Sequence, residues 1–210
     1  MKFLGLFLVV AAVSFGQEVK DISEIAKSTV LISVRLSGDV ELRATGIRIG
    51  PGVVVIPAKL IMLKSTGGGA IFVNEKQVKT VKNIGNDMLL LSLELSEGDA
   101  RMDFLQPTEL RAGEQPVWCV GYRHGQLAIQ LGNIMISPGR TLSLDPASTN
   151  VGIGWGIFSV DGRFLAMVQD HTMIFDPGSG LERSRTTITL RSGQSILADA
   201  GKFLAIPSKF

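Results

Sequence analysis

The sequence is poor in the residues that build cross-links and metal sites. A single cysteine, Cys119, excludes any disulfide bond within the chain. This cysteine lies in the apolar run PVWCVGY, so we expect its thiol to be buried and unreactive. The chain also has only two histidines, and together with the cysteine they give no spacing that could ligate a metal. We therefore predict no metal and no cofactor, and a fold that depends on its hydrophobic core.

An excess of charge of either sign is absent as well. The 210 residues contain 21 Lys and Arg against 19 Asp and Glu, scattered along the chain, for a net charge of +2. Without a basic stripe, nucleic acid is not an expected partner. Hydrophobic residues make up 45% of the chain and charged residues 19%, a balance that excludes a disordered protein.

Long hydrophobic runs are missing except at the N-terminus. There MKFLGLFLVVAAVSFGQEV combines one cation, Lys2, with an apolar run over 3–13 and small residues before a cleavage point. This layout is typical of a signal peptide, and the run is shorter than the roughly 20 apolar residues that span a bilayer. We expect residues 1–16 to be a cleaved signal peptide and residues 17–210 to form the mature domain, without a transmembrane span. The protein is then periplasmic or secreted.

The residues that are abundant indicate β-structure. Short runs rich in Val, Ile and Leu alternate with turn-forming residues, and the chain contains 24 glycines. These runs predict a first barrel at about 27–97 and a second at about 116–195. The most polar stretch lies between them, and we interpret about 98–115 as the connector.

Turns and helices are predicted at four places. Pro138-Gly139 and Asp161-Gly162 are turn signals, and the second joins GIFSV to RFLAMV as a hairpin. Helical patterns occur only in DISEIAKS, which starts at Asp21, and in GQSILADAGKFL near the C-terminus.

Several landmarks follow one another as they do in trypsin-like serine proteases. ATGIRIGPGVVVIPAKLI has the build of the strand and small-residue turn that lead into the general-base histidine, and Lys59 stands at that place. NDMLLLSLEL puts Asp87 at the expected distance downstream, where the family's aspartate opens an apolar strand. NVGIGWGIFSVDGRFLAMV is similar to the nucleophile turn and the following hairpin, with Gly154 in place of the serine. Taken in this order, over roughly residues 25–195, the chain resembles the bacterial HtrA type.

The resemblance implies an all-β fold of two six-stranded antiparallel β-barrels with a short C-terminal helix. It also implies a catalytic triad that is degenerate at Lys59, Asp87 and Gly154. Serine attack needs a hydroxyl whose proton passes to an imidazole, whereas glycine has no side chain and a protonated lysine has no lone pair. We therefore expect no catalytic residues: the chain is an inactive serine protease homologue, a pseudoprotease that acts as a protein- or peptide-binding or scaffold subunit. Lys59 either pairs with Asp87 or extends its ammonium group to water.

Two other interpretations stay open. The first is a hydrolase with a rearranged active site, in which Ser159, Ser148 or Thr149 supplies the nucleophile and His124 or His171 the base. Against it, an alternating strand points Ser159 away from the turn, and a single loop histidine is more often solvated or hydrogen-bonded. The second is a structural β-domain unrelated to proteases, which shares only generic strands and glycine turns with them.

A peptide can bind to such a fold even when the catalytic side chains are absent. In trypsin-like proteases the strand that corresponds to MVQDHTM offers its open edge to an extended peptide. We assign a peptide-binding cleft to the turn residues Gly152 and Trp155 and to the strand residues Gln169, Asp170 and His171. Trp155 is either a plug or binding anchor in this cleft or a side chain of the core.

Overall fold

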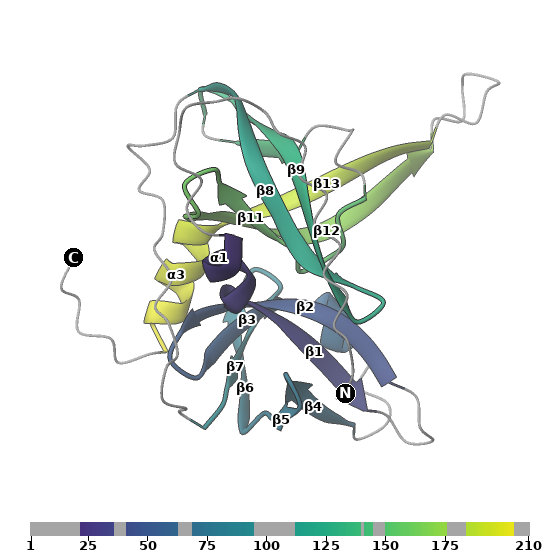
Figure 1. Cartoon of the computed structure of the whole chain (residues 1–210), viewed down its shortest axis with the longest axis vertical. Coiled ribbons are helices and arrows are strands. Elements are labelled where there is room, and N and C mark those ends of the chain that lie inside the picture. Colours follow the sequence, from purple (N-terminus) through teal and green to yellow (C-terminus); the bar gives the residue numbers. More distant parts are fainter. Residues whose placement is uncertain are drawn as a thin grey trace.

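The computed structural model describes residues 22–35, 41–62, 69–94, 112–139, 141–144, 150–175 and 184–203. The predicted signal peptide, most of the predicted connector, Ser148 and Thr149 lie outside these residues. The described part forms two antiparallel sheets and three helices (Figure 1). The helices are α1 (Ile22–Ser28), α2 (Lys59–Met62) and α3 (Gly193–Gly201). The sequence predicted α1 and α3, whereas the single turn of α2 was not foreseen.

The first sheet contains seven strands in the order β5-β4-β1-β2-β3-β7-β6. The strands are β1 (Thr29–Arg35), β2 (Glu41–Gly50), β3 (Val53–Pro57), β4 (Ala70–Val73), β5 (Lys76–Gln77), β6 (Thr80–Gly85) and β7 (Met88–Ser92). In β1, Val30, Ile32 and Val34 are at most 2% exposed, because alternate side chains of a strand point to the same face. The predicted run AIFVNEKQVKTVKNIG is divided into β4, β5 and β6. Asn74 and Glu75 break it with the left-handed backbone of a tight turn, at φ 45° and 69°.

The second sheet contains six strands in the order β10-β9-β8-β11-β12-β13. The strands are β8 (Gly113–Arg123), β9 (Gln126–Ile136), β10 (Leu142–Leu144), β11 (Gly156–Ser159), β12 (Phe164–Phe175) and β13 (Ser184–Ser192). The predicted turns are present, with Pro138-Gly139 between β9 and β10 and Asp161-Gly162 between β11 and β12. The end strands β10 and β13 lie against each other, so this sheet curls into a nearly closed barrel (Figure 1).

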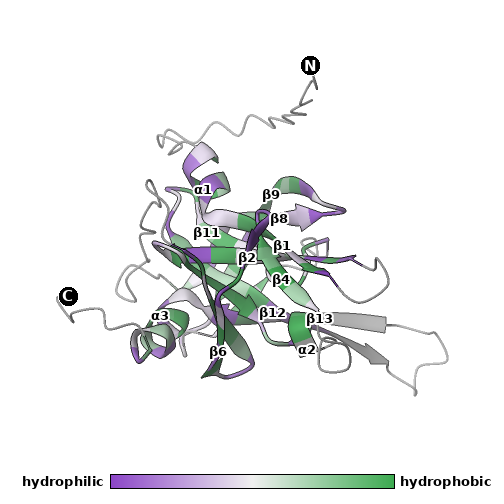
Figure 2. Ribbon diagram, turned by 90° about the horizontal axis from the view of Figure 1, so that it is seen from below, coloured by the Kyte–Doolittle hydropathy of each residue, from purple (hydrophilic) through white to green (hydrophobic). Residues whose placement is uncertain are grey.

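Buried hydrophobic side chains form three clusters. One lies within each sheet, and the third joins the two sheets to each other. The joining cluster includes Ile47 of β2, Phe158 and Phe164 of the β11–β12 hairpin, Ile25 of α1 and Ile196 of α3. Figure 2 shows the hydrophobic residues, in green, along β11 and β12 in the middle of the molecule. Full burial of each such side chain is worth about 1.5–3 kcal/mol, so this cluster fixes how the two sheets meet.

The predicted fold class is confirmed, with two antiparallel β-barrels and a short C-terminal helix. The first barrel has seven strands rather than six, because the two-residue β5 is added to it. Cys119 is fully buried in the cluster of the second sheet, and burial raises the pKa of its thiol to about 12. In the described ranges, none of the helices has the length and the apolar character that a membrane crossing requires.

Candidate functional site at the junction of the two sheets

Lys59 links the two sheets. It begins α2 directly after β3, and its Nζ atom lies 2.5 Å from Oδ1 of Asp170 on β12. The Lys59 side chain is 58% exposed and that of Asp170 is 34% exposed, so the ion pair lies at the surface of the junction. The hydrogen bond from Lys59 lowers the pKa of the Asp170 carboxyl, and a second hydrogen bond, from the backbone N–H of His171, acts in the same direction.

Asp87 supports the junction through its backbone. It lies in the β6–β7 turn at φ 56°, and its carbonyl oxygen accepts a hydrogen bond of 2.7 Å from the N–H of Ala58. This bond holds the residue that precedes Lys59. The described ion pair of Lys59 is with Asp170, and not with Asp87 as one of our two sequence hypotheses had it. The spacing along the chain indicated that Asp87 lies near Lys59. It could not show that Asp170, a residue of the other sheet, forms the ion pair with Lys59.

Gly154 is packed against the first sheet. Its φ of +86° is a left-handed conformation that favours glycine, and its N–H donates a hydrogen bond of 2.8 Å to the carbonyl oxygen of Val168 on β12. A Cβ atom added here would collide with the carbonyl oxygen of Thr45 on β2 and would lie 3.3 Å from Leu60. The backbone of β2 therefore fills the space in which a side chain at residue 154 would stand.

Trp155 belongs to the core of the second sheet. It is 2% exposed, and its indole covers Gly121 and Gly152, where an added Cβ would meet the ring. The Arg123 guanidinium lies 5.7 Å from the ring centroid, in a cation–π arrangement. Of our two interpretations of Trp155, the structure shows the core side chain. A ring in this position offers no anchor to a peptide.

The strand residues of the predicted cleft are bonded within the protein. The Gln169 side-chain amide donates a hydrogen bond of 2.6 Å to the carbonyl oxygen of Asn86, across the two sheets. The backbone N–H of His171 donates to Asp170 at 2.7 Å. The buried Nε2 atom of His171 has no hydrogen-bond partner among the described residues. Burial lowers the pKa of His171, Asp170 acts against this shift, and Lys59 adds to it.

Of the other residues considered for catalysis, the structure describes His124 and Ser159. His124 sits in the β8–β9 turn at φ 51°. The Ser159 hydroxyl is hydrogen-bonded to the Asp161 carboxylate and to the backbone of Arg163, within the β11–β12 hairpin. In the part of the chain that the structure describes, no cluster of three or more His, Cys, Asp or Glu residues could hold a metal ion.

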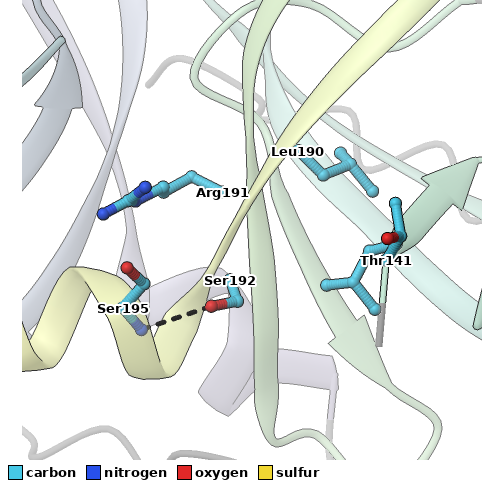
Figure 3. A pocket seen from close by; sticks show the side chains of 6 residues that line it. Thr141, Leu190, Arg191, Ser192 and Ser195 are labelled. Carbon is cyan, nitrogen blue, oxygen red and sulfur yellow. Dashed lines mark hydrogen bonds between the residues drawn. The ribbon is translucent and has the colours of Figure 1, made fainter. Parts of the chain in front are cut away.

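A hollow of about 250 Å³ lies at the start of α3 (Figure 3). It is lined by Thr141, Leu142, Leu190, Arg191, Ser192 and Ser195. Figure 3 shows the hydrogen bond of 3.2 Å that the N–H of Ser195 donates to the Ser192 hydroxyl, which caps α3. Arg191 pairs with Asp199 of α3 at 2.7 Å. These polar groups secure the C-terminal helix, and none of the predicted site residues lines the hollow.

The sequence did not identify three residues that shape the junction. Thr45 is 1% exposed, and its hydroxyl accepts a hydrogen bond of 2.8 Å from the N–H of Tyr122, between the two sheets. Asn86 and Val168 supply the carbonyl oxygens that engage Gln169 and Gly154. Asn86 and Val168 contribute backbone carbonyl oxygens, which any residue carries, so of the three only Thr45 contributes a side chain that the sequence could have indicated.

Comparison with known proteins gives the class of fold. No family model matches the chain, and no curated protein matches it. Solved structures do match, and they place the chain among two-barrel folds of the trypsin-like class.

Three of these structures are of the Rv3671c protease of M. tuberculosis. A mutant in the inactive form has a TM-score of 0.58 at 16% identity, over 90% of this chain and 92% of that chain. The inactive protease gives 0.56 at 17%, over 86% and 91%, and the active form gives 0.57 at 16%, over 86% and 82%. At this level of identity the likeness shows the fold.

Proposed function

We propose that the chain is an exported pseudoprotease: a trypsin-like domain without catalytic activity that serves as a protein-binding or scaffold subunit. The proposal rests above all on Gly154, at the position of the nucleophile. This residue has no side chain, the Thr45 carbonyl occupies the space of one, and its N–H is bonded to Val168. Gly154 therefore supplies neither a hydroxyl that could attack a carbonyl nor a free N–H that could stabilise an oxyanion.

The position of the general base supports the same reading. Lys59 is held by Asp170, and an ammonium group in an ion pair has no lone pair with which to accept a proton. Loss of the nucleophile or of the base lowers the rate of a serine hydrolase by on the order of 10⁶-fold. A chain that keeps the two barrels without this chemistry is suited to binding. The layout of its first residues supports export.

The decisive experiment measures covalent labelling and peptide hydrolysis. The purified protein is treated with a serine-directed fluorophosphonate probe and with a fluorogenic peptide library, beside an active trypsin-like protease as the positive control. We expect no labelling and no hydrolysis above the rate of a heat-denatured sample. Co-purification from native membrane and soluble envelope fractions then identifies the protein that it binds.

The rearranged hydrolase is the outcome that would overturn the proposal. It predicts turnover that is lost in the Lys59→Met or the His171→Asn variant and kept in Val81→Asn, a change at an exposed residue of β6. Turnover that survives in all three variants is tested further in His124→Asn and Ser159→Ala, the other described candidates for base and nucleophile, before it is assigned to a contaminating protease. Activity that depends on the junction would refute the pseudoprotease.

A further inference from the structure

One ring nitrogen of His171 is buried without a partner at the junction of the two sheets. This atom is Nε2, and none of the described residues forms a hydrogen bond with it. Opposite His171 on β13 lies Ile188, a hydrophobic residue that packs against the core cluster of the second sheet. Whichever nitrogen carries the proton of the neutral ring, the imidazolium carries a proton on both. Protonation would therefore bury a charged N–H donor at Nε2 without an acceptor, which costs free energy.

Two charged groups among the described residues act on this ring. Asp170, its neighbour on β12, attracts a positive charge, whereas Lys59 of α2 repels one. These two groups are already paired at 2.5 Å, so the ammonium group balances much of the charge that Asp170 could offer to an imidazolium. Burial is the largest cause of the lowered pKa of His171, while Asp170 acts against this shift and Lys59 adds to it. The neutral ring is therefore the form that fits the folded junction.

We propose that His171 is an acid-sensitive switch of the junction: when its ring takes up a proton, the ring leaves its buried place and β12 loosens against the first sheet. The strand can adjust here, because a β-bulge interrupts its register with β13 between Val168 and Asp170. Gln169 and Asp170, the two residues before His171, make side-chain bonds that cross the junction. A shift of β12 at His171 would therefore disturb both bonds. The switch does not depend on whether the domain is a pseudoprotease.

Mild acid is the condition that operates this switch. The pKa of His171 in the folded protein lies below its ordinary value of 6.5, so the unfolded chain binds more protons as the pH falls through 6.5. The stability that depends on the neutral ring is then complete above pH 6.5 and is lost towards the lower folded pKa. Above about pH 5.5 carboxylates stay largely ionised, so the two histidines are the side chains that titrate in this range. His124, exposed in the β8–β9 turn, serves as the reference.

Nuclear magnetic resonance of the two imidazole rings tests the electrostatics of the site. The matched variants His171→Asn and His124→Asn assign the two signals, and we expect the His171 signal to titrate with a midpoint below 6.5. Lys59→Met removes the repulsion and frees the Asp170 carboxylate, so the midpoint should rise. Asp170→Asn removes the attraction, so the midpoint should fall. A midpoint at or above 6.5, or one that Lys59→Met leaves unchanged, would overturn the proposal.

Hydrogen exchange shows whether the junction responds locally. The reporter is the N–H of Gly154, which is bonded to the Val168 carbonyl of β12, and the reference is the N–H of Ile32 on the central strand β1. Protection factors are corrected for the intrinsic pH dependence of exchange. Between about pH 7.5 and 5.5 we expect protection to fall at Gly154 and not at Ile32, in the wild type and in His124→Asn. Unchanged protection at Gly154, an equal fall at both amides, or a fall that persists in His171→Asn would each overturn the proposal.

Discussion

The junction of the two sheets and the outer face of β9 differ in whether their side chains are engaged in contacts within the protein or exposed to solvent. At the junction, Lys59 is bonded to Asp170, the Gln169 amide to the Asn86 carbonyl, and Gly154 packs against β2. On β9, the side chains of Leu127, Ile129 and Leu131 are exposed. The side chains and backbone groups at the junction are thus engaged in contacts within the protein.

The difference extends to packing. Trp155 is 2% exposed, whereas Leu131 on β9 is 46% exposed. A large buried side chain contributes more to the free energy of unfolding than an exposed one. Similar substitutions in the two regions should therefore lower the free energy of unfolding by very different amounts.

Truncation at Trp155 is expected to have the largest effect on stability. Trp155→Ala leaves a cavity over Gly121 and Gly152, and we expect a loss of about 3–5 kcal/mol in the free energy of unfolding. Leu131→Ala on β9 is the control, with an expected loss below about 1 kcal/mol. Urea unfolding followed by far-UV circular dichroism measures both. Equal losses would mean that the packing of the two regions is not as different as the exposures indicate.

A serine at residue 154, where the resemblance predicts the nucleophile, is expected to damage the fold without producing activity. In Gly154→Ser, the new Cβ meets the Thr45 carbonyl and the backbone is left-handed, so we expect a loss of at least about 2 kcal/mol. Gly139→Ser is the control, because nothing lies within 4 Å of a Cβ there. Unfolding curves and fluorophosphonate labelling are measured on both variants. A Gly154→Ser variant that is as stable as the wild type and is labelled would show that only the side chain had been lost.

The fold could be predicted to a large extent because its signals are local. Strand alternation, as in β1, and turn dipeptides such as Asp161-Gly162 give strands and hairpins directly. The sequence did not predict that the run AIFVNEKQVKTVKNIG divides at Asn74 and Glu75, because these residue types indicate a positive φ less clearly than glycine does. The order of the landmarks then indicated the two barrels, and this was correct.

The sequence did not predict the contacts of the candidate site residues. Lys59, Gly154 and Asp170 do lie at one junction. Their partners, however, come from residues distant in the chain, and several of them act through carbonyl oxygens that every residue carries. Trp155 could not be assigned to the core or to the surface from its neighbours alone, because its place depends on Gly121, a residue of another strand.

The Lys59–Asp170 pair is expected to have the smallest effect, and the effect should depend on pH in one direction. The pKa of Asp170 is below its ordinary value of 3.8 in the folded protein, chiefly because of the hydrogen bond from Lys59. The stabilisation is therefore complete above pH 3.8 and is lost as the pH falls through the lower folded pKa. Because the pair is exposed to solvent, we expect Asp170→Asn to cost no more than about 1 kcal/mol near neutral pH.

A double-mutant cycle of Lys59→Met and Asp170→Asn isolates the pair from the other contacts of each residue. The coupling energy should be positive near neutral pH and should vanish well below pH 3.8, where both partners can no longer be charged. The same cycle on Lys79 and Glu94, an exposed pair outside the junction, controls for a general effect of acid on surface charges. A coupling that is zero near neutral pH, or that grows as the pH falls, would mean that Lys59 does not hold the two sheets together through Asp170. The junction would then depend on the buried hydrophobic cluster between the sheets and on the neutral hydrogen bonds of Gln169 and Thr45, and not on this ion pair.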